Sequence, residues 1–339
     1  MRAIGYKTPG PLGSEGSLTD IELPEPEAQG HDLLVRVAAV SVNPVDTKVR
    51  QGMAPDSGDW RVLGWDAAGT VVAAGPQVTR FAVGDAVFYA GALGRPGTNA
   101  ELHLVDERIV GAKPRTLDFA EAAALPLTAV TAWEALSDRL EVRRPVPGAA
   151  RALLLIGGAG GVGSIAIQLA RKLTDLVVIA TASRPDTRDW ALSMGAHHVI
   201  DHSRPMAPQI EALGTGAPSF VFSTTHTGAH LDDIAALIAP QGRFAVIDDP
   251  ERLDILPFKR KSVSVHWEFM FTRTMFATAD MAAQGALLAE VSRLVDAGEI
   301  RTTLTERFGT INAANLARAH ALIESGKARG KIVLEGFDA

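Results

Sequence analysis

Residues 151–163 read Arg-Ala-Leu-Leu-Leu-Ile-Gly-Gly-Ala-Gly-Gly-Val-Gly, and a helix-forming stretch, 164–172, follows directly. An apolar run that leads into a glycine-rich loop and then a helix is typical of the first strand, loop and helix of a dinucleotide-binding fold. Gly158, Gly160 and Gly163 match G-x-G-x-x-G, in which the glycines allow a tight turn, close approach of a pyrophosphate and close packing of the helix. A glycine loop that serves only as a turn is the alternative. The residues predicted to contact a dinucleotide here are Gly158, Gly160, Gly161, Val162 and Gly163.

The segment after the next predicted strand, 177–181, indicates which dinucleotide is bound. A site that prefers NAD usually places an Asp or Glu at this strand end to bind the ribose 2′-hydroxyl. This chain instead reads Thr-Ala-Ser-Arg-Pro-Asp-Thr-Arg over 181–188. Charge-assisted hydrogen bonds from arginine to phosphate are worth about 1.5–3 kcal/mol each, so we expect NADPH to be preferred about tenfold or more. We predict that Ser183, Arg184 and Arg188 bind the 2′-phosphate, with Arg184 foremost; the alternative is two arginines solvated at a helix start.

Composition excludes several classes of protein. A chain of 339 residues should form about two domains, and its 47% hydrophobic and 21% charged residues are usual for a globular protein. The net charge of −6 offers no basic surface to nucleic acid. The absence of cysteine excludes disulfides and cysteine-based metal or nucleophile sites. The N-terminus lacks an apolar signal core, and the uncharged run 152–170 is explained by a strand and a helix, so we expect a cytoplasmic enzyme with no membrane partner.

Strand and helix patterns alternate from residue 151 to about 270. Beyond the first two strands, further strands are expected at 198–201, 219–224, 243–248 and 262–267. Alternation of this kind predicts an α/β Rossmann nucleotide-binding domain with a six-stranded doubly wound parallel sheet.

The first 115 residues have a different pattern. Short β-type runs at 32–42, 69–74, 86–89 and 100–105 are separated by Gly and Pro turns, which is typical of a small, mostly β barrel. A helix is expected at 118–125, because Asp118 and Glu121 have the spacing of a capping box, and Pro126 interrupts it.

Several motifs in order give the chain a family resemblance over nearly its whole length. They are SVNPVDTKVRQG at 41–52, LGWDAAGTV at 63–71, GDAVF at 84–88, AAALPLTAVTAW at 122–133, the glycine loop, and the closing segment 320–334 with GKIVL at 330–334. The chain thereby resembles the medium-chain dehydrogenase/reductase superfamily, and within it the quinone oxidoreductase (zeta-crystallin)-like branch, whose members are often labelled zinc-type alcohol dehydrogenase-like. The resemblance implies a mostly β GroES-like barrel domain from 1–125 with 308–339, a Rossmann NADP-binding domain from 126–307, and a homodimer or homotetramer.

The zinc ligands of the superfamily's alcohol dehydrogenases are missing from this chain. Those enzymes have a Cys where Asn43 stands, a His where Trp65 stands and a further Cys or Asp near 125–128, whereas a catalytic zinc needs three such ligands. His226 and His230 have helical i,i+4 spacing but no third partner in the sequence. We therefore predict no metal.

Without a Lewis acid to polarise an alcohol, we expect hydride transfer from NADPH to a small electrophilic acceptor, a quinone or an α,β-unsaturated carbonyl compound. The resemblance implies that Asn43 is an amide donor beside the nicotinamide or substrate; the alternative is an Asn that holds the turn before Pro44. Lys48 stands where many relatives carry Tyr and could donate a hydrogen bond or a proton, or could simply be solvated. Asp46 and Asp66 are expected to be structural acceptors.

The resemblance also implies roles for residues outside the loops discussed above. Thr131 resembles a threonine that contacts the nicotinamide ribose, although a helix hydroxyl bonded to the preceding turn is the alternative. His202 stands where relatives often have Tyr beside the adenosine phosphate, or is a surface histidine, and Lys331 is expected to bind cofactor. An apolar wall around the acceptor is expected from aromatic residues that could equally fill cores: Trp65, Trp267, Phe269 and Phe271.

Three functions compete on this basis. The first is an NADPH-dependent, zinc-independent quinone or enone reductase. The second is a zinc-type alcohol dehydrogenase, and the third is an NADPH-binding sensor or crystallin-like protein with negligible turnover, since a fold does not determine a function. The physiological acceptor, the proton donor and the subunit number are left open by the sequence.

Overall fold

The structure, a computed structural model, describes residues 1–14, 16–55 and 59–337. It divides into two compact units, which we call unit 1 (1–130 and 271–339) and unit 2 (131–270). The sequence predicts a nucleotide-binding domain from 126 to 307, whereas in the structure residues 126–130 and 271–307 belong to unit 1. The physical reason is close packing of helix α9 (Ala283–Asp296) within unit 1: a Cβ on Gly285 would lie 2.4 Å from the carbonyl oxygen of Arg108.

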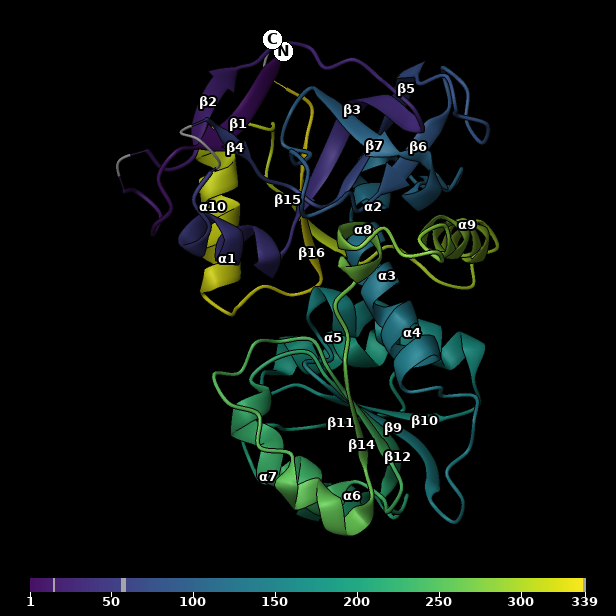
Figure 1. The fold of residues 1–339 in the computed structure, drawn as a ribbon. Coiled ribbons are helices and arrows are strands. Elements are labelled where there is room, and N and C mark those ends of the chain that lie inside the picture. The colour runs from purple at the N-terminus through teal and green to yellow at the C-terminus, as the bar shows by residue number, and fades with distance from the viewer. Residues whose placement is uncertain (15, 56–58, 338–339) are drawn as a thin grey trace. The chain divides into compact units, whose positions relative to one another are not determined.

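Unit 2 contains the predicted six-stranded parallel sheet (Figure 1). The strand order is β11-β10-β9-β12-β13-β14, and every neighbouring pair is parallel. The direction in which strands are added reverses between β9 and β12, which makes their carboxyl ends the topological switch point where ligands of such sheets bind. The strands are β9 (Ala150–Ile156), β10 (Val177–Thr181), β11 (His198–Ile200), β12 (Pro218–Ser223), β13 (Arg243–Val246) and β14 (Ser264–Trp267).

Helices cover both faces of this sheet, with α4 and α5 on one side and α6 and α7 on the other (Figure 1). Strand β9 is therefore buried on both faces, and Leu153, Leu154 and Leu155 are completely inaccessible to solvent. Each such side chain contributes about 1.5–3 kcal/mol of burial free energy, so the apolar run at the start of the motif anchors the sheet. The helical segments are α4 (Gly161–Leu173), α5 (Pro185–Ser193), α6 (Met206–Leu213), α7 (Thr227–Leu237), the π-helix η3 (Ala135–Arg139) and the 3-10 helix η4 (Leu256–Lys261).

Unit 1 is mostly β, as predicted for the GroES-like domain. A seven-stranded sheet has the order β15-β16-β3-β5-β6-β8, with β7 paired to β3, and a three-stranded sheet has the order β2-β1-β4. The strands are β1 (Arg2–Tyr6), β2 (Thr19–Glu22), β3 (Asp32–Val42), β4 (Arg61–Val62), β5 (Ala67–Ala74), β6 (Ala86–Tyr89), β7 (Leu102–Asp106), β8 (Gly111–Ala112), β15 (Leu304–Arg307) and β16 (Lys331–Glu335).

The remaining helices include α3, which contains the boundary between unit 1 and unit 2 at residues 130 and 131. Asp118 caps α2 and forms the predicted capping box with Glu121. Helix α10 lies beside α1, where the Arg50 guanidinium donates to Glu324 and to Nδ1 of His320 (Figure 1). These helices are α1 (Pro44–Gly52), η2 (Glu107–Ile109), α2 (Phe119–Ala123), α3 (Pro126–Glu134), α8 (Thr272–Met275), α9 and α10 (Ala313–Glu324).

The uncharged run 152–170 is divided between β9 and α4, as its strand-to-helix pattern predicts. Within the described ranges, no helix combines the length and the apolar character needed to span a membrane.

Candidate functional site

The glycine loop lies at the carboxyl end of β9 and is held by the neighbouring strand β10. The backbone N–H of Gly157 donates to Oγ1 of Thr181 at 3.1 Å, and that of Gly158 donates to the Thr181 carbonyl at 3.0 Å. Gly157 has a φ of +83°, a conformation that glycine adopts without steric cost. The loop is therefore fixed at the switch point of the sheet.

The three motif glycines have different surroundings, which distinguish packing from access. A Cβ on Gly163 would lie 2.2 Å from the Gly157 carbonyl oxygen, and one on Gly158 would lie 2.7 Å from the Cβ of Ala180. A Cβ on Gly160 would meet nothing closer than 3.5 Å. Gly158 and Gly163 thus serve close packing, whereas a Cβ on Gly160 would make only an ordinary van der Waals contact.

Gly160 adjoins the start of α4. Gly160 is the N-cap residue and contributes no side-chain hydrogen bond to the helix. The first N–H groups of a helix have no partner within it and carry a partial positive charge, so they bind anions well. Gly161, Val162 and Gly163 are the first three residues of α4. The loop and helix start therefore fit the pyrophosphate of a dinucleotide.

The structure separates the two arginines predicted to bind a 2′-phosphate. Arg188 donates from Nη1 to the carbonyl oxygen of Val199 at 2.6 Å, which ties α5 to β11. Arg184 is the N-cap residue of α5; its side chain is 41% exposed, and its Nε lies 3.4 Å from Oδ1 of Asp186. Ser183, beside it, is exposed. Arg184 is consequently better placed than Arg188 to meet a ligand at this edge.

One further cation, not predicted from the sequence, follows the adjacent strand. Thr181 pairs with Ile200, so the residues after β10 and β11 leave the sheet side by side. Arg204 lies in the second of these loops, with a 77% exposed side chain 3.5 Å from the Asp201 carboxylate. The sequence could have indicated Arg204 as a candidate phosphate ligand, because it is an arginine a few residues after the third predicted strand.

His202 lies at the same edge, half-buried. Its Nδ1 is 2.8 Å from Oγ1 of Thr181, the atom that also accepts the Gly157 N–H, and its ring is 5.8 Å from that of His230. Burial and the neighbouring His230 lower the pKa of His202, so the imidazole is neutral at neutral pH. A hydrogen-bonded chain therefore connects the glycine loop with the end of β11.

In unit 1, Asn43 is buried and its amide is used within the protein. Its backbone N–H donates to Oδ2 of Asp46 at 2.7 Å, which completes the capping box of α1. Its Nδ2 donates to Oδ2 of Asp66 at 2.8 Å and to the Ser41 carbonyl at 3.4 Å. The side chain is 1% exposed. In this arrangement the amide hydrogens stabilise the chain around Pro44, and the role of Asn43 toward a substrate stays a prediction.

Lys331, which is predicted to bind cofactor, has its ammonium engaged within unit 1. Its ammonium donates to the Val42 carbonyl, to Oδ1 of Asn43 and to Oδ2 of Asp66, the first and last at 3.0 Å. An ammonium has three donors, so all of them are directed to protein oxygens. The side chain is 3% exposed, and Lys331 is here a structural cation.

The same cluster tests whether zinc fits where the resemblance places its ligands. Burial raises the pKa of Asp66, and the nearby Lys331 ammonium opposes this shift. The oxygens of Asn43 and Asp66 that could face a metal are bound to that ammonium, whose charge would repel a second cation. In the part of the chain that the structure describes, no three His, Asp or Glu side chains are grouped so that they could hold a metal ion. The residues present do not fit a catalytic zinc.

The other predicted site residues are distributed over both units. Lys48 is exposed on α1, whereas Thr131 is 5% exposed in α3. In unit 1, the rings of Trp65 and Phe271 pack edge to face with centroids 6.1 Å apart. In unit 2, aromatic side chains near the end of β14 are exposed: Trp267 by 55% and Phe269 by 45%.

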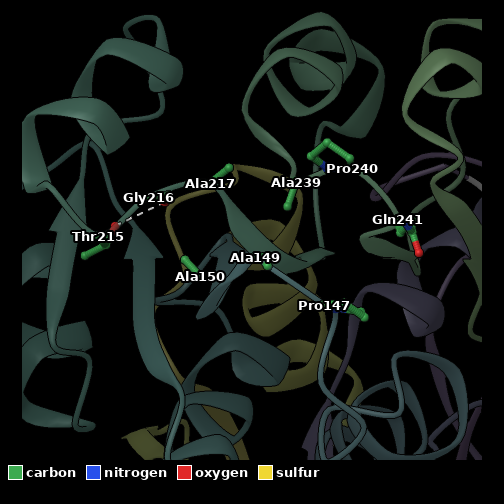
Figure 2. A pocket seen from close by; sticks show the side chains of 10 residues that line it. Pro147, Ala149, Ala150, Thr215, Gly216, Ala217, Ala239, Pro240 and Gln241 are labelled. Carbon is green, nitrogen blue, oxygen red and sulfur yellow. Dashed lines mark hydrogen bonds between the residues drawn. The ribbon is translucent and has the colours of Figure 1, made fainter.

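A pocket of about 440 Å³ lies at the opposite edge of the parallel sheet (Figure 2). It adjoins the starts of β9, β12 and β13, and no charged side chain lines it. Ligands of open α/β sheets bind at the carboxyl ends of the strands, so this pocket is not the candidate site. Its lining residues are Pro147, Gly148, Ala149, Ala150, Thr215, Gly216, Ala217, Ala239, Pro240 and Gln241.

Comparison with known proteins extends these observations. Residues 29–115 match the alcohol dehydrogenase GroES-like domain family, and residues 194–334 match the zinc-binding dehydrogenase family. A zinc-type alcohol dehydrogenase-like protein of Staphylococcus aureus (strain MSSA476) is 39% identical over 98% of this chain and 99% of its own length. A 2-methylene-furan-3-one reductase of Solanum lycopersicum is 28% identical over 91% of this chain and 73% of its own.

A solved structure from Rhizobium etli CFN 42, described provisionally as a zinc-dependent alcohol dehydrogenase protein, is 66% identical. The match covers 100% of this chain and 99% of that one, with a TM-score of 0.98. With the GroES-like domain, the Rossmann sheet and these relatives, the chain belongs to the medium-chain dehydrogenase/reductase superfamily, a family of oxidoreductases that use nicotinamide cofactors.

Proposed function

We propose that this protein is an NADPH-dependent, zinc-independent reductase that acts on a quinone or an α,β-unsaturated carbonyl compound. The observation that carries the proposal is the position of Lys331: its ammonium is bound to the oxygens of Asn43 and Asp66, and Asn43 stands where the sequence resemblance places a cysteine ligand of the zinc enzymes. A metal-free site cannot polarise an unactivated alcohol, so the acceptor must be electron-poor by its own structure.

The cofactor half of the proposal rests on unit 2. The backbone at Gly160 and the start of α4 would hold the pyrophosphate, and Arg184, assisted by Ser183, would bind the 2′-phosphate. No acidic residue stands at the end of β10, where one would select the 2′-hydroxyl of NAD. Bound NADPH supplies the hydride, and the protein supplies orientation and polar groups.

The proposed class of acceptor is supported by the lack of a fitting zinc site and by the name of one relative. The tomato relative is named as a reductase of 2-methylene-furan-3-one, a ketone conjugated to a methylene group. Conjugation makes the methylene carbon of such a ketone electrophilic. On our chain, Lys48 is the proposed donor to the acceptor oxygen, because it is exposed on α1. Asn43 and Asp46 fix the first turn of that helix and so position Lys48.

The test is NADPH consumption by chelator-treated protein with a panel of quinones, enals and enones, with NADH and with alcohols plus NADP⁺. We expect consumption of NADPH, faster than that of NADH, with at least one conjugated acceptor. Alcohol oxidation that requires added zinc would show the protein to be an alcohol dehydrogenase. Tight NADPH binding without consumption on any acceptor would instead show a sensor or crystallin-like protein.

A further inference from the structure

Three histidines gather at the edge of unit 2 where the glycine loop lies. His202 follows β11, and its ring centroid is 5.8 Å from that of His230 on α7. His226 lies one helical turn before His230, at the N-cap of α7. The sequence shows the helical spacing of His226 and His230, whereas only the fold brings His202 to them. Since the described residues form no metal site, what distinguishes this group is that imidazoles titrate near neutral pH.

His202 is bonded to the residue that holds the glycine loop. Its Nδ1 lies 2.8 Å from Oγ1 of Thr181, and that oxygen accepts the backbone N–H of Gly157 at 3.1 Å. A hydroxyl can donate to a neutral imidazole or accept from a charged one, so either state of the ring keeps this contact. The charge of His202 can therefore change without loss of the support that Thr181 gives to the loop.

The groups that face the two half-buried rings set their charge in the absence of a ligand. Burial disfavours the charged form of both rings, and neighbouring groups add to this: His230 and Arg184 for His202, and His226 for His230. The pKa values of His202 and His230 are thereby lowered from 6.5. The carboxylates that oppose this shift are Asp201, Asp233 and Asp248.

A bound dinucleotide would change this balance, because its pyrophosphate is a dianion. The proposed site places that dianion at the glycine loop, which Thr181 joins to His202. An opposite charge within about 4–6 Å shifts a pKa by about 1–3 units toward the charged form, and less at a longer distance. Repulsion between the two neighbouring rings allows one of them, and not both, to become charged. Ligand binding and uptake of one proton should then favour each other.

We propose that the pair formed by His202 and His230 takes up a proton from solvent when a dinucleotide binds, so that the affinity of unit 2 for pyrophosphate ligands rises as the pH falls. His202 is a positioning residue, since it supports the glycine loop through Thr181. The inference rests on the proposed function, because it requires a dinucleotide to bind unit 2. It adds a dependence on pH that the glycine loop and Arg184 alone would not give.

The test measures proton uptake by calorimetry with ADP-ribose, a readout independent of turnover. ADP-ribose carries the pyrophosphate but lacks the 2′-phosphate, whose own pKa of about 6 would obscure the result with NADPH. Titrations at about pH 6.5 in two buffers of different ionisation enthalpy give the number of protons taken up. We expect the native protein to take up a large fraction of one proton. Its affinity should be about tenfold higher at about pH 5.5 than at about pH 8, as for a pKa shift of about one unit.

Three variants assign the proton to the histidine pair. His202→Gln retains a hydrogen-bonding group toward Thr181 and removes the charge, so it should keep the melting temperature and take up less of the proton. His202→Gln combined with His230→Gln should abolish the uptake and the pH dependence of the affinity. His198→Gln, which changes a histidine at the start of β11, should behave as the native protein does.

The outcomes separate this inference from the proposed function. Equal affinity of the native protein for ADP-ribose at the two pH values, without proton uptake, overturns this inference alone. Uptake that persists in the double variant also overturns it, because another group then binds the proton. Failure of both ADP-ribose and NADPH to bind at either pH overturns the proposed function, and this inference with it.

Discussion

The ammonium nitrogen of Lys331 lies 3.0 Å from Oδ2 of Asp66, and neither side chain is more than 3% exposed. Oδ1 of the same aspartate accepts the backbone N–H of Leu127 at 2.7 Å. This buried ion pair thereby connects β16, the segment before β5 and the first turn of α3. A buried charge that loses its partner is strongly destabilising, so the pair is central to the stability of unit 1.

Replacement of Lys331 tests that role. Lys331→Met leaves the carboxylate of Asp66 buried without a cation and should lower the free energy of unfolding by about 3–5 kcal/mol. Lys327→Met, at an exposed position, should change it by less than about 0.5 kcal/mol. Urea unfolding of both variants measures the difference. Similar stabilities for the two would show that the ion pair is not structural.

Cofactor choice should depend on Arg184 more than on Arg188. Arg184→Ala should raise the KM for NADPH about tenfold or more and leave the KM for NADH nearly unchanged, because only the 2′-phosphate contact is lost. Arg188→Ala removes the hydrogen bond to Val199 and should lower the melting temperature with a smaller change in the NADPH to NADH ratio. An Arg184→Ala variant that affects both cofactors equally would refute the phosphate assignment.

Substitutions of two loop glycines should have different effects, one on NADPH binding and the other on stability. Gly160→Ala has space in the protein and should leave the melting temperature near that of the native protein, yet weaken NADPH binding because the methyl group occupies the pyrophosphate approach. Gly163→Ala places a methyl group 2.2 Å from the Gly157 oxygen and should destabilise unit 2. Calorimetric titration with NADPH and thermal melting measure the two effects. Unchanged binding by Gly160→Ala would remove this glycine from the site.

Asp46 should make stability depend on pH. Its burial raises its pKa from 3.8 to about 7, so folding takes up a proton between these values. The stability contributed by this group is therefore fully present at low pH and is lost as the pH rises to about 7 and beyond. Asp46→Asn retains an acceptor and removes the titration, so its stability relative to the native protein should be more favourable at about pH 8 than at about pH 5. Denaturant unfolding at both values checks this, and an equal difference at the two would contradict it.

The Rossmann sheet could be predicted from the sequence because its strands are long apolar runs between helices. The barrel was predicted less completely: β3 and β6 match their expected ranges, whereas β1, β2, β4 and β8 were not recognised. Four consecutive residues of β1 are buried, so its side chains do not alternate between buried and exposed. Strands β4 and β8 have only two residues each, which is too short to show a period-2 pattern.

Some contacts of the candidate site could not be predicted because they join residues that are far apart in the sequence. The motif around Asn43 and the closing motif with Lys331 are far apart in sequence, and only the antiparallel pairing of β16 with β3 brings them together. His202 and His230 likewise meet only in the folded unit 2. Sequence spacing carries no signal for such contacts, whereas the glycine loop is a local motif and was recognisable.

The proposed reaction is the reduction of a conjugated acceptor by NADPH without zinc. The most direct measurement is NADPH consumption by a preparation whose zinc content is determined at the same time by elemental analysis. We expect turnover with a quinone, enal or enone at less than about 0.1 zinc per chain, unchanged by a chelator. A tightly held zinc, about one per chain, whose removal abolishes the activity would contradict it.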